Sequence, residues 1–138
     1  MIVDTSAIVA ILRGEPGSEF LSRMIVDDPD PTMSAATLVE LHAVADVRGE
    51  PAQARRVDAL LAALGMRIVP FDEQQATIAR DAYRDFGKGS GHPAKLNLGD
   101  CFSYALAVHM GEPLLFVGDD FTHTDIVSAL TPPGPPAA

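Results

Sequence analysis

Short apolar or extended runs alternate along this chain with longer segments whose apolar residues recur at helical spacing. The short runs are residues 1–3, 32–33, 67–71 and 114–117, with a last strand or turn at 126–129. The helical segments are residues 5–14, 15–26, 34–48, 51–64, 73–86 and 97–110. Strands that alternate with helices in this way form a parallel sheet with helices on both faces. The sequence therefore predicts an α/β fold, a three-layer α/β/α sandwich with a mostly parallel central sheet.

One domain accounts for residues 1–130, since a chain of 138 residues that is 47% hydrophobic and 21% charged has the composition of a single globular domain. The Pro-rich residues 131–138 cannot form regular structure, and we expect a flexible tail there. The one cysteine, Cys101, excludes an intramolecular disulfide and any CxxC metal site. No apolar run is long enough to span a membrane and residues 1–4 lack the basic start of an export signal, so we expect a cytoplasmic protein without membrane association.

The formal net charge is −9, from ten Lys and Arg against nineteen Asp and Glu. Such a surface is poorly suited to nucleic acid, because affinity for a phosphate backbone comes largely from basic side chains that release counterions. If the partner is nucleic acid, a local basic patch, a bound cation or a basic partner protein must provide the attraction.

Carboxylates follow two of the predicted strands. Asp4 follows residues 1–3, and Asp119 and Asp120 follow residues 114–118. The carboxyl ends of parallel strands form the edge where ligands bind. Each acid also has an ordinary structural interpretation, Asp4 as a helix N-cap worth about 1 kcal/mol and the other two as a polar turn. However, like charges at one edge repel each other unless a cation lies between them.

Two further acids lie within predicted helices. Glu40 shares a helix side with the apolar Leu41 and Val44, although a solvated surface position is an equally good interpretation. Asp100 lies three residues after Asn97, which is the spacing of a capping box. It also lies in the first turn of the most apolar helix, where an acid is well placed to line a site.

Carboxylates from four separate parts of the sequence are the oxygen ligands that Mg²⁺ or Mn²⁺ requires. Such ions neutralise a phosphodiester and activate water, so they would let an acidic chain act on nucleic acid. Other chemistries are poorly supported. The histidines lack zinc-binding spacing, Cys101 and Ser103 lie within a helix without nucleophile-elbow glycines, and residues 87–91 lack the strand and spacing of a phosphate-binding loop.

Four motifs contain these acids: MIVDTSA at 1–7, LVEL at 38–41, GHPAKLNLGDCFSYALA at 91–107 and LFVGDDF at 115–121. Together they resemble the PIN-domain family and, within it, the VapC toxins of bacterial type II toxin–antitoxin systems. The resemblance implies a Mg²⁺- or Mn²⁺-dependent endoribonuclease that cleaves structured RNA, often transfer RNA, and so inhibits translation. It also implies a homodimer and a cognate VapB-like antitoxin whose C-terminal segment blocks the acidic groove.

The resemblance also assigns roles to residues. It makes Asp4, Glu40 and Asp100 metal-binding and catalytic, with either Asp119 or Asp120 as the fourth acid. Glu40 would hold a second ion or orient the attacking water, and cleavage would leave a 3′-hydroxyl and a 5′-phosphate. Ser6 matches a small hydroxyl residue beside the first aspartate. Four basic residues near the loop before Asp100 are either phosphate contacts or solvated surface charges: Arg80, Arg84, Lys88 and Lys95.

Two alternatives remain open from the residues. A strand followed by Asp4, with Gly118-Asp119 near the other end and Lys95 upstream, is similar to a haloacid-dehalogenase-type phosphotransferase. That family usually has a second aspartate where this chain has Ser6, and it leaves Glu40 and Asp100 unused. The second alternative is a non-catalytic α/β binding module, whose acidic pocket would bind metal without turnover.

Overall fold

The computed structural model describes residues 1–45, 49 and 51–130 of the chain. Within them the strands are β1 (Ile2–Val3), β2 (Thr32–Ser34), β3 (Arg67–Val69) and β4 (Leu114–Leu115). The helices are α1 (Thr5–Leu12), α2 (Ser18–Asp27), α3 (Ala35–Ala45), α4 (Pro51–Ala63), α5 (Glu73–Phe86) and α6 (Leu98–Met110). The Pro-rich tail predicted at 131–138 and the end of the helix predicted at 34–48 lie outside the described residues.

The strands form one parallel sheet in the order β3-β2-β1-β4. Ile2 of the central strand β1 is aligned with Thr32 on one side and with Leu114 on the other. The strand or turn predicted at 126–129 contributes a single parallel bridge, Leu114 to Ser128. The prediction of an α/β fold with a parallel sheet is confirmed.

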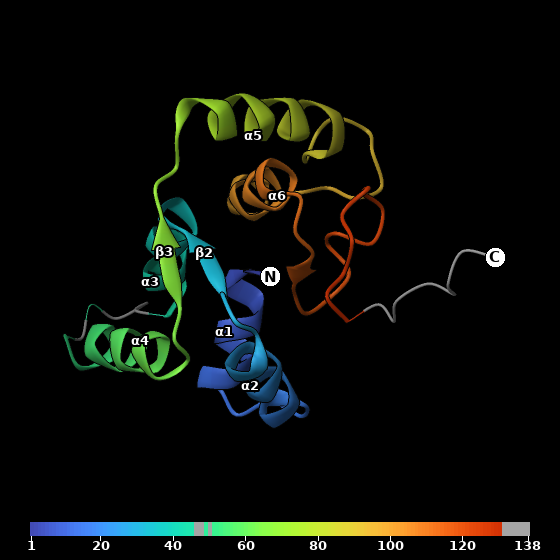
Figure 1. Cartoon of the computed structure of the whole chain (residues 1–138). Coiled ribbons are helices and arrows are strands. Elements are labelled where there is room, and N and C mark those ends of the chain that lie inside the picture. Colours follow the sequence, from blue (N-terminus) through green and yellow to red (C-terminus); the bar gives the residue numbers. More distant parts are fainter. Residues whose placement is uncertain (46–48, 50, 131–138) are drawn as a thin grey trace.

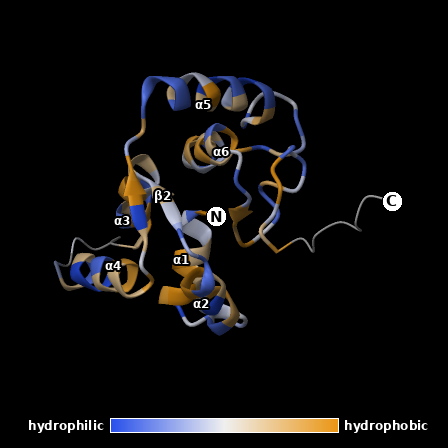
Figure 2. Cartoon of the chain, in the orientation of Figure 1, coloured by the Kyte–Doolittle hydropathy of each residue, from blue (hydrophilic) through white to orange (hydrophobic). Residues whose placement is uncertain are grey.

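Helices cover both faces of this sheet, as Figure 1 shows. Ile2 and Leu114 belong to a core shared with α5 and α6. Their neighbours Val3 and Leu115 belong to a second core with α1, α2, α3 and α4. This alternation follows from the strand period of two residues and yields three layers. In Figure 2 α5 is more hydrophilic than α6, which packs between α5 and the sheet.

Three helices have side-chain caps at their N-termini. Asp4 caps α1 by accepting from the Ser6 amide, and Asp72 caps α5 by accepting from the Gln75 amide. Asn97 and Asp100 form a complete capping box at the start of α6. The caps of α1 and α6 hold two acids at one edge of the sheet. None of the helices in the described ranges is long and apolar enough to cross a membrane.

Candidate acidic site

Asp4 lies where β1 ends and α1 begins, and its side chain is only 3% exposed. Both carboxylate oxygens accept hydrogen bonds. Oδ1 accepts from the Ser103 hydroxyl at 2.5 Å, and Oδ2 accepts from the Ser6 hydroxyl at 2.8 Å and the Ser6 amide at 3.1 Å. Burial raises the pKa of Asp4, and these hydrogen bonds offset part of that rise. The carboxylate is therefore held in one orientation at the carboxyl edge of the sheet.

Asp100 lies in the first turn of α6 and is 7% exposed. Its Oδ2 accepts from the Asn97 amide at 3.0 Å. The pKa of Asp100 is raised from 3.8 to about 7, mainly because of burial and further because of the negative charges of Asp4, Asp120 and Glu40. The Asp100 side chain therefore both caps α6 and belongs to the acidic site.

Glu40 reaches the same region from α3. It is half-buried, and its Oε1 accepts from the Thr5 hydroxyl at 2.6 Å. Burial raises the pKa of Glu40, and the charge of Asp4 raises it further. The carboxylate lies directly over the Cα atom of Gly99, where an added Cβ would overlap it. Only a glycine at this position leaves room for the Glu40 carboxylate as it is placed.

Asp119 and Asp120 are both exposed in the loop after β4. Of the two, Asp120 is the one whose charge raises the pKa of Asp100. The start of this loop is tied to Asp4, because the Val117 amide donates to the Ser6 hydroxyl at 3.0 Å. Ser6 thus connects the first acid to the loop that carries the fourth.

Sequence reasoning missed several residues that support these acids. Ser103 and Thr37 are fully buried, and their hydroxyl oxygens lie 3.3 Å apart. Ser103 follows Asp100 by three residues, a spacing that places both on one side of α6. That spacing is a usable signal, as is a polar residue within an apolar helix. No sequence signal indicates that Thr37, Thr5 or Gly99 contacts the site.

The charge of this site is not neutralised by basic residues. Among the described residues, Asp4, Glu40 and Asp100 form no ion pair with Lys, Arg or His. Buried carboxylates without a basic partner, all with oxygen donors, fit a hard divalent cation by their chemistry. Within residues 1–45, 49 and 51–130, no three His, Cys, Asp or Glu side chains stand close enough together to hold a metal as placed. On binding an ion, these carboxylates would have to move closer to one another.

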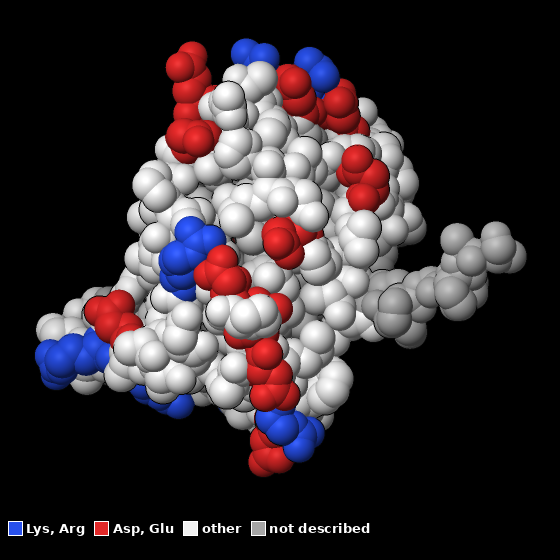
Figure 3. Space-filling model, in the orientation of Figure 1, with Lys and Arg blue, Asp and Glu red and all other residues white. Residues whose placement is uncertain are grey.

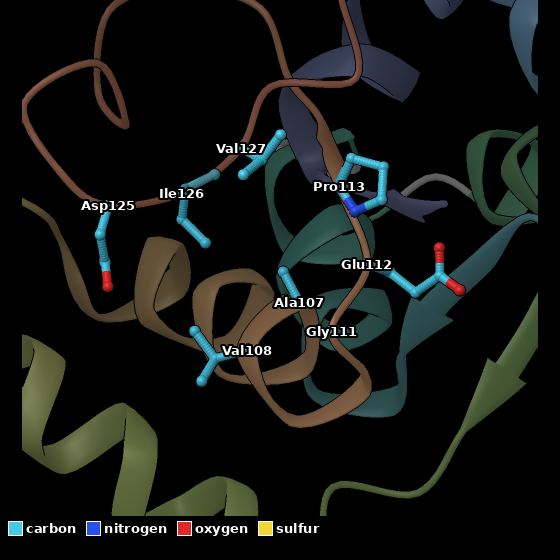
Figure 4. A pocket seen from close by; sticks show the side chains of 8 residues that line it. All are labelled: Ala107, Val108, Gly111, Glu112, Pro113, Asp125, Ile126 and Val127. Carbon is cyan, nitrogen blue, oxygen red and sulfur yellow. The ribbon is translucent and has the colours of Figure 1, made fainter. Parts of the chain in front are cut away.

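A separate hollow of about 330 Å³ lies at the opposite end of α6 (Figure 4). It is lined mainly by apolar residues between the end of α6 and residues 125–127. None of the acids described above lines it, so it is distinct from the acidic site.

Comparison with known proteins places this geometry in context. The PIN domain family matches residues 1–127. Ribonuclease VapC42 of Mycobacterium tuberculosis is 56% identical over 131 residues, which are 95% of this chain and 100% of that protein.

Two solved structures share the fold. The crystal structure of Mycobacterium tuberculosis VapC20, described as a sarcin-ricin loop cleaving toxin, has a TM-score of 0.69 at 18% identity and covers 93% of this chain and 97% of its own. A toxin–antitoxin complex from Klebsiella pneumoniae has a TM-score of 0.61 at 16% identity and covers 87% and 88%.

Proposed function

We propose that this chain, which belongs to the PIN-domain family and is a VapC ribonuclease, cleaves structured RNA at the carboxylates gathered around Asp4. As a VapC ribonuclease it is the toxin of a toxin–antitoxin system. One observation carries the assignment of the site. Asp4, Glu40 and Asp100 come together at the carboxyl edge of the sheet, and each has a pKa raised by burial.

Four residues would hold the metal. In this proposal Asp4, Asp100 and Asp120 bind Mg²⁺ or Mn²⁺, and Glu40 binds a second ion or orients the attacking water. We choose Asp120 over Asp119 because the charge of Asp120 acts on Asp100. When bound, the ion would neutralise the phosphodiester and lower the pKa of a water molecule.

The side chains of the protein supply the positioning. Ser6 and Ser103 fix both oxygens of Asp4, and Thr5 fixes one oxygen of Glu40. Because Asp4 and Asp100 are buried and have no basic partner among the described residues, a bound cation would favour their charged forms. Divalent binding and deprotonation of Asp100 are therefore expected to occur together.

The negative charge of the acidic site is also expected to attract the antitoxin. As a toxin component the chain has an antitoxin partner, and we propose that a C-terminal segment of that VapB-like partner blocks the acidic groove with a basic side chain. The net charge of −9 supports such an inhibitor. We further propose that the toxin is a homodimer, which sedimentation of the purified toxin would test.

The phosphotransferase alternative receives no support, because it gives Glu40 and Asp100 no role and does not account for the family match. A PIN domain that binds metal without turnover remains an outcome of the experiment below.

The test is cleavage of total cellular RNA by the purified, antitoxin-free protein. We expect discrete cuts with 5′-phosphate ends in Mg²⁺ or Mn²⁺, no cuts in EDTA, and no cuts with Asp100→Asn or Asp120→Asn. Asp119→Asn is the matched control and is expected to retain activity. Intact RNA from a folded, metal-loaded wild type would instead indicate a binding module.

A further inference from the structure

A second charged feature lies in the loop between α5 and α6. The chain contains only two lysines, Lys88 and Lys95. Both line one surface hollow of about 350 Å³, together with His92, Pro93 and two glycines. In a chain with a net charge of −9, a hollow lined by both lysines and a histidine is unusual.

The loop that forms the hollow is held in place on both sides. The Lys88 amide donates to the Leu96 carbonyl at 2.9 Å, and the Leu96 amide donates to the Phe86 carbonyl at 2.8 Å. Leu96 is fully buried. The loop is therefore anchored to the end of α5, and its lysines are presented on a fixed backbone.

His92 is oriented by two contacts. Its ring packs edge-on against Phe86 with centroids 4.9 Å apart, and its Nδ1 accepts from the Ala94 amide at 3.1 Å. With Nδ1 acting as an acceptor, the neutral ring carries its proton on Nε2 as a hydrogen-bond donor. The two lysines and the histidine that line the hollow are therefore all hydrogen-bond donors.

These lysines differ from the arginines nearby. Arg80 and Arg84 on α5 form ion pairs with Asp81 and Asp85. Among the described residues, neither lysine forms an ion pair with a carboxylate. The lysines therefore remain available to an external anion, whereas the arginines are already partly neutralised.

The hollow adjoins the acidic site through a short stretch of chain. Lys95 precedes Asn97 by two residues, and the Asn97 amide donates to Asp100 at 3.0 Å. Two trans peptides separate the Cα atoms of Lys95 and Asn97 by no more than about 7.6 Å. A nucleic-acid strand whose phosphate lies at Asp100 can therefore reach the lysines within a few nucleotides.

We propose that the hollow lined by Lys88, His92 and Lys95 binds a backbone phosphate of the RNA substrate, next to the phosphate that is cleaved. This proposal rests on the proposed function, which it extends by giving the acidic chain a local cationic contact for RNA. Phosphate contacts of this kind fix the register of the strand and carry no sequence information.

RNA binding in EDTA tests the hollow independently of cleavage. The probe is fluorescently labelled bulk tRNA, and Kd is measured by anisotropy over a series of salt concentrations. For Lys88→Gln/Lys95→Gln we expect binding at least tenfold weaker and a salt slope reduced by about 0.7, because the hollow neutralises one phosphate and each such contact contributes about 0.7 for a single strand. The matched control is Arg80→Gln/Arg84→Gln, which removes the same charge and is expected to change both quantities much less. Lys88→Arg/Lys95→Arg is expected to restore binding.

Two results would overturn the proposal: unchanged tRNA binding by the lysine variant, or equal weakening by the lysine and arginine variants. Cleavage assays with Mg²⁺ separate this failure from that of the proposed function. If the wild type cleaves and the lysine variant binds and cleaves equally well, the hollow is refuted and the nuclease stands. If the wild type binds tRNA through the lysines but cleaves no RNA in total cellular RNA, the hollow stands and the proposed cleavage is refuted.

Discussion

Hydroxyl groups and one glycine position the carboxylates of the acidic site. The Asp4 carboxylate accepts hydrogen bonds from the hydroxyls of Ser6 and Ser103, and the Glu40 carboxylate accepts one from the hydroxyl of Thr5. A buried polar atom left without a partner costs about 1–3 kcal/mol, so these donors constrain where the acids can lie. Gly99 acts by the absence of a side chain, because any Cβ there would occupy the place of the Glu40 carboxylate.

Replacement of Gly99 by alanine tests this steric role. We expect Gly99→Ala to push the Glu40 carboxylate aside and to lower RNA cleavage at least tenfold, while the melting temperature changes little because the far end of a flexible side chain can move. The measurement is the initial cleavage rate in a double-mutant cycle with Glu40→Ala. If Gly99 acts through Glu40, Gly99→Ala causes no further loss in the Glu40→Ala background. A full additional loss would show that the glycine acts elsewhere.

The pKa of Asp100 predicts how stability depends on pH. In the metal-free folded state, burial raises this pKa from its ordinary value of 3.8 to about 7. Between these values the folded state binds more protons than the unfolded state, so this carboxyl makes the protein less stable as pH rises from about 4 to 7. Asp100→Asn removes the penalty. We expect the metal-free variant to melt several degrees above wild type at pH 8 and close to it at pH 4, since 1 kcal/mol is worth about 4 °C in a chain of this size.

Thermal unfolding in EDTA at the two pH values measures this difference. The stability of the matched variant Asp119→Asn should follow that of wild type, because the charges that raise the pKa of Asp100 are those of Asp4, Asp120 and Glu40. A variant Asp100→Asn that melts below wild type at pH 8 would contradict the account.

The N-termini of α1 and α6 place two of the acids, Asp4 and Asp100, at the site. Asp4 is the N-cap of α1 and Asn97 is the N-cap of α6, so the positive ends of both helix dipoles lie at the carboxyl edge of the sheet. The cap of α6 has two tasks, because the Asn97 side chain accepts from the Asp100 amide at 2.8 Å and the Asn97 amide donates to the Asp100 carboxylate. Helix initiation and site geometry are therefore linked in α6.

A comparison of two caps separates these tasks. Asn97→Ala and Asp72→Ala each remove an N-cap, at a cost of about 1 kcal/mol in the free energy of unfolding. Asp72 caps α5, and within the described residues its hydrogen bond to Gln75 and its ion pair with His109 do not reach the acidic site. We therefore expect both variants to lose similar stability in denaturant titrations, but only Asn97→Ala to lose cleavage activity. Equal activity in both variants would show that the α6 cap serves the helix alone.

The sequence predicts the elements well because their signals are local. Apolar periodicity, the caps Asp4 and Asn97, and the glycines that end helices depend on neighbouring residues alone. The structure shortens β4 to Leu114–Leu115, since pairing with β1 ends there. The contacts of Thr37 with Ser103 and of Gly99 with Glu40 depend on how α3 packs against α6, which no local pattern specifies. Spacing likewise did not separate Asp119 from Asp120.

Charge is unevenly distributed over the whole molecule. On the face drawn in Figure 3, acidic side chains are spread widely, and Lys and Arg form a few small, separate groups. A surface of this kind repels RNA at long range, so RNA binding requires local attraction. In this account a divalent ion at the buried acids provides one such attraction and the two lysines provide another.

Titration of Mn²⁺ into the metal-free protein tests the central claim most directly, namely that Asp4, Asp100 and Asp120 hold a divalent ion. Free Mn²⁺ is followed by its electron paramagnetic resonance signal, at pH 8. We expect wild type and Asp119→Asn to bind one or two ions, and Asp100→Asn and Asp120→Asn to lose at least tenfold in affinity. Undiminished binding by Asp100→Asn, or no binding by a folded wild type, would contradict the account.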